Sequence, residues 1–369
     1  MIEKKEFLFT QLITYLGNKR ALLFEIEKMV KKCTKRINKE KCICADLFSG
    51  SGVVSRMLKK HSSKIIANDL EEYAKVLNEC YLTNEKDFNN KFYDECRNKI
   101  IKSFSHEIQN ENEGIICKNY APKNDEAIKI EERVFYTREN ALRIDAFRKL
   151  IDEYVPKEMQ KYFLAPLLTE CSVHTNTSGV FKGFYKDKKT GIGCFGGTGK
   201  NALSRILKPI ELPVPVFSRF ESNVEVFQKD AVELSQELKK IDIAYLDPPY
   251  NQHPYGSNYF MLNVILKNKI EGNLSNVSGI VSDWNRSNFN KPQFAMQSME
   301  NIISNLDAKF IIISYNSEGF ISFNDMKNML KKYGIVETVE MKYNTFRGSR
   351  NLREREIHVR EFLFVLEKF

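Results

Sequence analysis

A short apolar run that ends abruptly in glycines sets the narrowest limits on how this chain folds. Residues 42–48 (Cys-Ile-Cys-Ala-Asp-Leu-Phe) have the composition of a buried strand, and Ser-Gly-Ser-Gly follows at residues 49–52. A helix-like stretch to about Lys60 and a second apolar run at residues 65–69 come next. Strand, turn, helix and strand in this order open a parallel α/β sheet. We therefore expect an α/β fold that binds its ligands where the strands end.

The alternation of predicted strands and helices resumes in the second half of the chain. Apolar runs predict further strands at residues 224–227, 241–246 and 310–314, a helix at 325–332, and a closing antiparallel strand pair at 335–342 and 361–366. We therefore expect that these elements and the first strands belong to one sheet-forming domain, which an insertion at about residues 80–220 splits.

An insertion interrupts the sheet-forming pattern. Residues 85–145 are crowded with charges of both signs and contain little glycine or proline, which indicates helices with solvated faces. We predict a catalytic domain of residues 1–80 and 220–369, split by an inserted domain of residues 81–219 that is helical over 85–170.

Residues 172–208 differ from the rest of the insertion in glycine and lysine content. They hold seven of the 17 glycines, and seven Lys or Arg against one acidic residue, Asp187. Glycine permits tight turns and lysine neutralises phosphates, so this stretch is typical of a DNA-contacting hairpin region; a plain solvated hairpin is the alternative. The candidate contacts are Lys182, Lys186, Lys188, Lys189 and Lys200.

Composition excludes several classes of protein. With 42% hydrophobic and 28% charged residues, the 369-residue chain is neither disordered nor collagenous. It contains no apolar run near the ~18 residues of a membrane span and no secretory signal at its start, so we expect a cytoplasmic protein without a membrane partner. Its eight cysteines lack a CxxC pair, which favours reduced thiols and no metal site. The net charge of +9 permits a nucleic-acid partner.

The sharpest motif is Asp247-Pro248-Pro249-Tyr250, directly after the apolar run at residues 241–246. Two prolines fix the backbone and present one carboxylate, one carbonyl and one aromatic ring rigidly. Asp247 and the Pro248 carbonyl suit the two N–H groups of an exocyclic amine, whose lone pair then points at an electrophile, and Tyr250 suits stacking on the base. A proline turn with an Asp cap is the structural alternative.

The glycine turn at residues 49–52 has the character of a ligand-binding loop. Glycines between a strand and a helix let a ligand approach the backbone closely. Ser55 stands where the dinucleotide fingerprint requires its third glycine, so that fingerprint is absent. Asp69, at the end of the next strand, is placed to bind a ribose diol.

Two further segments are candidate DNA contacts. Residues 251–260 are polar and aromatic with one glycine, which we interpret as a mobile loop that closes over an extruded base; a polar surface loop is the alternative. The candidates there are His253, Tyr255, Asn258 and Tyr259. A loop between the last two strands carries a cluster of arginines, which suit phosphate contacts: Arg347, Arg350, Arg353 and Arg355. Pairing of some of them with Glu354 and Glu356 is the alternative.

The ordered set of motifs resembles the Dam-like, alpha-group DNA adenine-N6 methyltransferases of restriction–modification systems, over about residues 10–80 and 220–366. The resemblance implies a Rossmann-like methyltransferase sheet, mostly parallel with a C-terminal antiparallel hairpin, and makes residues 81–219 the inserted target-recognition domain. It implies S-adenosylmethionine as cofactor and double-stranded DNA as substrate. It also implies a functional pairing with a restriction endonuclease without a stable complex; we expect a monomer.

The resemblance assigns roles residue by residue. Asp247, Pro248, Pro249 and Tyr250 match the catalytic motif, and Lys19 with the neighbouring backbone would lie near the methionine moiety of the cofactor. Asp69 matches the acid that holds the ribose, and Asp230 the acid that contacts the adenine amine. The implied cofactor-binding residues are Tyr15, Leu16, Gly17, Asn18, Lys19, Asp46, Phe48, Ser49, Gly50, Gly52, Asp69, Leu70, Asp230 and Ala231.

Other functions fit the residues less well. A carbon-5 cytosine enzyme needs a cysteine nucleophile after proline, and no cysteine follows one. An amino-cytosine enzyme more often has Ser at position 247, and enzymes that methylate RNA or protein glutamine have Asn there. A DNA-binding regulator without turnover, or a module for another dinucleotide, remains as the alternative from a different class.

Overall fold

The computed structural model describes residues 2–197, 199–270, 272–344 and 358–369. The described residues form one seven-stranded sheet in the order β3-β2-β1-β4-β5-β7-β6. Neighbouring strands are parallel except for β7, which runs antiparallel to both β5 and β6. The strands are β1 (Cys42–Asp46), β2 (Ser62–Asp69), β3 (Asn223–Gln228), β4 (Ile241–Leu246), β5 (Ala308–Asn316), β6 (Gly334–Asn344) and β7 (His358–Lys368). The predicted α/β sheet and its C-terminal antiparallel hairpin are therefore confirmed.

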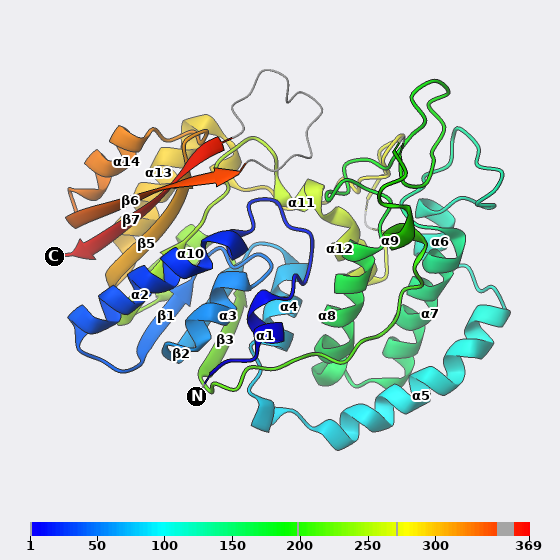
Figure 1. Ribbon diagram of the computed structural model, residues 1–369, viewed down its shortest axis with the longest axis horizontal. Coiled ribbons are helices and arrows are strands. Elements are labelled where there is room, and N and C mark those ends of the chain that lie inside the picture. The colour runs from blue at the N-terminus through cyan, green and yellow to red at the C-terminus, as the bar shows by residue number, and fades with distance from the viewer. Residues whose placement is uncertain (1, 198, 271, 345–357) are drawn as a thin grey trace.

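Helices cover both faces of the sheet, as Figure 1 shows. Successive strand residues point to opposite faces, so Ile243 packs with α2 and α3 while Ala244 packs with α10, α13 and α14. The covering helices are α1 (Lys5–Phe9), η1 (Lys19–Leu22), α2 (Leu23–Ile37), α3 (Val53–Lys59), α10 (Ala231–Glu237), η3 (Asn288–Asn290), α13 (Pro292–Asn305) and α14 (Phe323–Leu330). In the described part of the chain, no helix has the length and apolar composition of a membrane span.

A group of helices, which we call the helical lobe, lies beside the sheet, at the right of Figure 1. One apolar core runs through it and includes Tyr93 of α5, Phe163 of α8 and Phe260 of α12. The core therefore joins helices of the insertion (residues 81–219) to α4, which ends at its first residue, and to α12, which follows it. The members are α4 (Glu72–Tyr81), η2 (Glu85–Asp87), α5 (Asn90–Gln109), α6 (Ile115–Tyr120), α7 (Arg138–Tyr154), α8 (Lys157–Val173), α9 (Leu203–Leu207), α11 (Tyr255–Asn258) and α12 (Phe260–Lys267).

The non-helical parts of the insertion are turns and loops. Residues 121–137 contain no helix or strand among their described positions, in a stretch with Pro122 and Asn124-Asp125 as turn formers. Within residues 172–208 a short hairpin forms, in which Lys186 and Gly193 make an antiparallel bridge and Cys194 N donates to the Tyr185 carbonyl at 2.9 Å.

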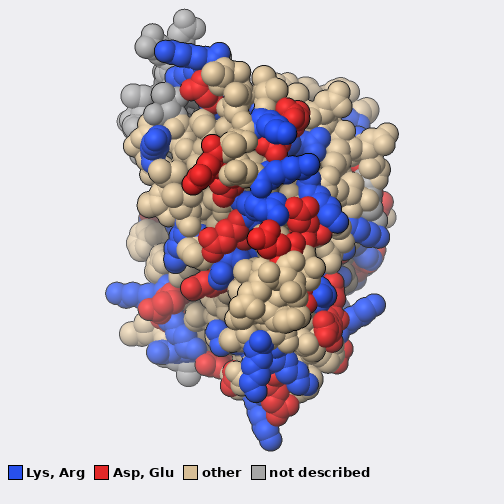
Figure 2. Space-filling model, turned by 90° about the vertical axis from the view of Figure 1, so that its right-hand side faces the viewer, with Lys and Arg blue, Asp and Glu red and all other residues tan. Residues whose placement is uncertain are grey.

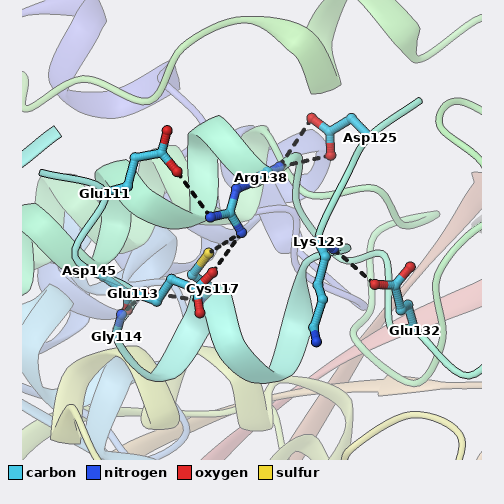
Figure 3. Close-up of polar contacts among 9 residues, drawn as sticks. All are labelled: Glu111, Glu113, Gly114, Cys117, Lys123, Asp125, Glu132, Arg138 and Asp145. Atoms are coloured by element: carbon cyan, nitrogen blue, oxygen red, sulfur yellow. Dashed lines mark hydrogen bonds and ion pairs between the residues drawn. The ribbon is translucent and has the colours of Figure 1, made fainter. Parts of the chain in front are cut away.

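Two side chains of α7 hold the loop before α6 and the start of the 121–137 segment in place, as Figure 3 shows. The Asp145 carboxylate accepts from the backbone N–H groups of Gly114, Ile116 and Cys117 at 2.9–3.0 Å. At the beginning of the same helix, the Arg138 guanidinium pairs with Glu111 and Glu113, and its backbone N–H donates to Asp125. A carboxylate thus takes the free N–H groups at the start of α6, which is a favoured arrangement at a helix N-terminus.

We expect the Asp145→Ala variant to lose about 3 kcal/mol of unfolding free energy, because three backbone N–H groups would lose their acceptor. Asp145 is only 7% exposed, so water does not readily replace the lost carboxylate. Urea unfolding measures the change. Glu132→Ala is the matched control, since this carboxylate also accepts from two backbone N–H groups but in exposed bonds that water replaces; it should lose about 0.5 kcal/mol or less. Equal losses in both variants would contradict the expectation.

Candidate active site

A cavity of about 870 Å³, including its part open to solvent, lies at the carboxyl ends of the parallel strands β1, β2, β3 and β4. Ligands of open α/β sheets bind at this position. Its lining includes all the predicted cofactor residues except Gly52. Of the predicted catalytic residues, Asp247 and Pro249 line it, whereas Pro248 and Tyr250, both described, do not. The cavity thus brings together side chains that lie more than half the length of the chain apart in the sequence.

The glycine turn forms the floor of the cavity next to β1. Gly50 has a φ of +50°, and a Cβ on it would lie 2.6 Å from the Tyr15 ring. Its backbone N–H donates to Asp69 Oδ2 at 2.8 Å, and the Asn78 amide donates to Ser49 Oγ at 3.0 Å. The turn is therefore fixed by side chains of β2 and α4, with its backbone facing the cavity. Gly52 begins α3 behind this surface.

Buried carboxyl groups surround the turn. Burial raises the pKa of Asp46 to about 7 and that of Asp69 to about 6. Hydrogen bonds oppose this rise, from Ser55 to Asp46 and from backbone N–H groups to Asp69. Asp230 lies at the end of β3 and caps α10, where its Oδ1 accepts from Val232 N at 2.8 Å. These carboxyl oxygens are hydrogen-bond acceptors directed at one cavity.

Asp247 follows β4 and is held by a lysine. Its Oδ1 lies 3.0 Å from Lys19 Nζ, and the same nitrogen lies 3.0 Å from Oε1 of Glu361 on β7. Lys19 Nζ also donates to the Gly17 carbonyl at 3.2 Å. The ammonium therefore faces three protein oxygens, among them the predicted catalytic carboxylate of Asp247, a pairing that the sequence did not suggest. The place of Lys19 near a methionine moiety stays a prediction. Burial raises the pKa of Asp247 to about 6, with Lys19 opposing the rise.

Three tyrosines stack beside the cavity, and two of them come from the segment predicted as a mobile loop. Tyr15 stacks on Tyr255 and on Tyr259, with 4.9 Å between ring centroids in each pair. The Tyr255 hydroxyl donates to the Leu16 carbonyl at 2.9 Å, and the Tyr259 hydroxyl accepts from Leu16 N at 2.7 Å. Residues 251–254 form no helix or strand, whereas residues 255–260 contain α11 and the start of α12 instead of a loop.

The structure buries two of the four predicted DNA contacts in this segment and leaves the other two partly or fully exposed. Tyr259 and Asn258 are buried, at 0% and 2% exposure, and Tyr255 is half-buried against the cofactor cavity. His253 remains exposed. The spacing of Tyr255 and Tyr259 places both rings on one helix face, a signal that the polar composition of the segment concealed.

Several cavity residues were missed by sequence reasoning. Glu71, Gly256, Asn285 and Phe289 line the cavity, and none of them was a predicted site residue. The Asn285 amide donates to Glu71 Oε2 at 3.3 Å and to the Leu70 carbonyl at 3.0 Å. Burial raises the pKa of Glu71 to about 7. Glu71 could have been found from its position, because it is an acidic residue only two positions after Asp69. Nothing in the sequence distinguishes Asn285 from the residues of a surface loop.

The other predicted DNA contacts lie apart from the cavity or outside the described residues. Lys182, Lys188, Lys189 and Lys200 are exposed, and Lys186 is half-buried with its ammonium 5.0 Å from the centre of the Phe184 ring. Figure 2 shows the outer face of the helical lobe, where basic and acidic side chains alternate rather than forming one basic patch. The arginine cluster, Arg347, Arg350, Arg353 and Arg355, lies outside the described residues.

Comparison with known proteins decides the family. A family model described as D12 class N6 adenine-specific DNA methyltransferase matches residues 15–329. The chain belongs to this family. Strands β1 to β5 and the whole insertion lie within the matched range, so the family assignment rests on most of the chain of this D12-class methyltransferase.

Named relatives agree with the assignment. The D12-class methyltransferase is 29% identical to Type II methyltransferase M.NlaIII of Neisseria lactamica, over 96% of this chain and 99% of that protein. It is 31% identical to Type II methyltransferase M.CviAII of Paramecium bursaria Chlorella virus 1, over 95% and 97%. Modification methylase StsI of Streptococcus sanguinis is 27% identical over 96% of this chain and 52% of that protein. The protein is thus an adenine-specific DNA methyltransferase, and its family and fold imply a reaction that depends on S-adenosylmethionine.

We expect Gly50→Ala to raise the dissociation constant for S-adenosylmethionine at least about tenfold, because the left-handed backbone and the Tyr15 ring both oppose a Cβ. Isothermal titration calorimetry measures the constant. Gly183→Ala is the matched control, since a Cβ there meets nothing within 4 Å. An unchanged affinity for S-adenosylmethionine in Gly50→Ala would show that the turn is not part of the binding surface.

Proposed function

We propose that this D12-class methyltransferase methylates the N6 amino group of an adenine flipped out of double-stranded DNA, at a specific sequence. The observation that carries the proposal is that Asp247 opens into the same cavity as Asp69 and Asp230. An amine held at Asp247 and a cofactor held by the other two carboxylates would then meet in one place. Positioning of this kind supplies a large share of the barrier reduction in group transfer.

The cavity has the chemistry that an adenosyl cofactor needs. Phe48 and Phe289 meet edge to face at 5.3 Å between centroids, and both line the cavity with Ala231, which gives an apolar wall for a purine ring. Asp69 and Asp230 offer acceptors for ribose hydroxyls and for the adenine amine of the cofactor. When bound, S-adenosylmethionine supplies an electrophilic methyl group.

The catalytic motif activates the target amine. In our proposal Asp247 and the Pro248 carbonyl each accept one N–H of the adenine, so that the nitrogen lone pair is free to attack. Tyr250, whose ring meets Tyr315 edge to face at 6.2 Å between centroids, stacks on the flipped base. The methylated amine loses its proton to solvent, and no covalent enzyme intermediate is required.

Target recognition belongs, in this proposal, to the inserted residues 81–219, with residues 1–80 and 220–369 as the catalytic domain. We add residues 272–282 to the recognition side, because two of their contacts reach the insertion. The Tyr120 hydroxyl donates to the Gly279 carbonyl at 2.8 Å, and the Ser278 hydroxyl donates to the Lys182 carbonyl at 2.7 Å. Sequence readout by this surface would explain why a lysine-rich hairpin lies next to it.

The biological role we propose is modification in a restriction–modification system. The named relatives are type II methyltransferases and a modification methylase. Methylation would protect DNA from a cognate endonuclease without a stable complex between the two enzymes. A monomer acting on one strand at a time is sufficient for this task.

We expect Asp247→Ala to lower methyl transfer about 10²–10³-fold, since it removes one of two acceptors for the amine. Labelled methyl from S-adenosylmethionine is followed into unmethylated genomic DNA, and the nucleosides are separated. Wild type should label N6-methyladenine. Cofactor affinity, measured in parallel, should stay within a few-fold in the variant. Label in cytosine only, or full activity in the variant, would contradict the proposed reaction.

We expect the Lys188→Ala/Lys189→Ala variant to bind duplex DNA more weakly and with a salt dependence lowered by about 2 in log–log slope, about one for each phosphate that a lysine no longer neutralises. Both lysines are exposed at the hairpin tip. The matched control is Lys91→Ala/Lys99→Ala on the outer face of α5, which removes the same charge. Equal slopes for the two variants would exclude the hairpin as a phosphate-binding element.

A further inference from the structure

Behind the catalytic carboxylate lies a buried ion cluster that involves three distant parts of the chain. Lys19 of η1 is 4% exposed, and Glu361 of β7 is 2% exposed. The lysine nitrogen lies 3.0 Å from Asp247 Oδ1 on one side and 3.0 Å from Glu361 Oε1 on the other. Burying charges is costly unless they are paired and hydrogen-bonded, so the two carboxylates and the ammonium depend on one another.

Glu361 is anchored from the neighbouring strand. The Ser314 hydroxyl of β5 donates to its Oε1 at 2.8 Å, and the Asn316 amide donates to its Oε2 at 3.3 Å. Asn316 and Glu361 are directly paired in the antiparallel ladder of β5 and β7. The carboxylate is therefore fixed by rigid sheet elements rather than by a loop, which is how precise sites are held.

The charges explain why a second carboxylate is present. During methyl transfer the adenine nitrogen gains positive charge as its bond to the methyl carbon forms and the carbon–sulfur bond breaks. A site charge that favours this change must be negative. The charges of Asp247 and Lys19 cancel each other, and the added charge of Glu361 gives the cluster of three groups a net charge of minus one.

We propose that Glu361 is a positioning residue for methyl transfer, acting through Lys19 on Asp247. By drawing the ammonium to Oδ1, the cluster fixes the carboxylate plane and keeps Oδ2 for the substrate amine, and Glu361 maintains the negative charge that the transition state requires. The proposal rests on the adenine methyl transfer proposed above and adds a residue to it.

The pH dependence follows from the groups around Asp247. These are Lys19 of η1, Glu361 of β7, Asp46 of β1, Tyr245 of β4, Tyr250, and Tyr255 of α11. Burial raises the pKa of Asp247 to about 6, Lys19 lowers it and Glu361 raises it. Asp247 accepts from the amine as the anion, so activity falls as pH drops through its pKa. Removing the charge of Glu361 lowers that pKa and moves the acid limb to lower pH.

The decisive variant is Glu361→Gln, which keeps the shape of the side chain and one acceptor oxygen but removes its charge and its second acceptor. We expect its single-turnover methylation of unmethylated genomic DNA to fall roughly ten- to a hundredfold, the size expected for one unscreened charge near the reacting atoms. Affinity for S-adenosylmethionine should be unchanged. The acid limb of kcat/KM against pH should move to lower pH, and Glu361→Asp, which keeps the charge, should recover part of the rate.

Glu367→Gln is the matched control, because it removes a carboxylate on the same strand that pairs with Arg36 at the surface. It should retain the wild-type rate and pH profile. A wild-type rate in Glu361→Gln, or a loss without the downward shift of the acid limb and without recovery in Glu361→Asp, would overturn the proposal. Active wild-type enzyme in the same assay separates that failure from failure of the proposed methyl transfer, which would show as no N6-methyladenine from any variant.

Discussion

The ion pair between Lys19 and Asp247 holds the site together. It joins a short helix before the first strand to the turn after β4, and Glu361 extends it to the last strand of the sheet. All three groups are largely removed from water, so their charges are stabilised by one another and by hydrogen bonds with Ser314, Asn316 and the Gly17 carbonyl. The cluster thereby fixes the Asp247 carboxylate relative to the cavity floor, where Gly50 and Asp69 are joined by their own hydrogen bond.

The sheet and the helical lobe are joined by shared helices and by a stack of tyrosine rings. The parallel strands bring their carboxyl ends to one edge, and α4 and α12 pass from that edge into the core of the lobe. Tyr15, Tyr255 and Tyr259 pack where the two parts meet, so the wall of the cofactor cavity is also part of the junction. This packing fixes the helical lobe relative to the Asp247-Pro248-Pro249-Tyr250 motif, as the proposed target-recognition role requires.

The local signals in the sequence were sufficient for the fold and for much of the site. The runs that became β1 and β4, the glycine turn around Gly50, and the acids at the strand ends were all readable, because each depends on neighbours in the chain. Glu361 was missed because its partners at positions 19 and 314 lie far away in sequence, and because β7 also carries Arg360 and Glu367, so no local pattern distinguishes it. Tyr259 was misplaced because polar and aromatic composition is shared by surface loops and by short helices that bury their rings.

Local patterns in the chain thus specify the α/β sheet, its closing hairpin, the glycine turn, the Asp-Pro-Pro-Tyr motif and the family resemblance. Strand periodicity and turn chemistry are properties of short segments, so they can be read without knowledge of the fold. Which groups meet is visible only in the folded chain: Lys19 contacts Asp247, Glu361 completes the cluster, and α11 and α12 pack their tyrosines on Tyr15. Such contacts arise when distant segments are buried against one another, and burial then sets both the pairing of the charges and their pKa values.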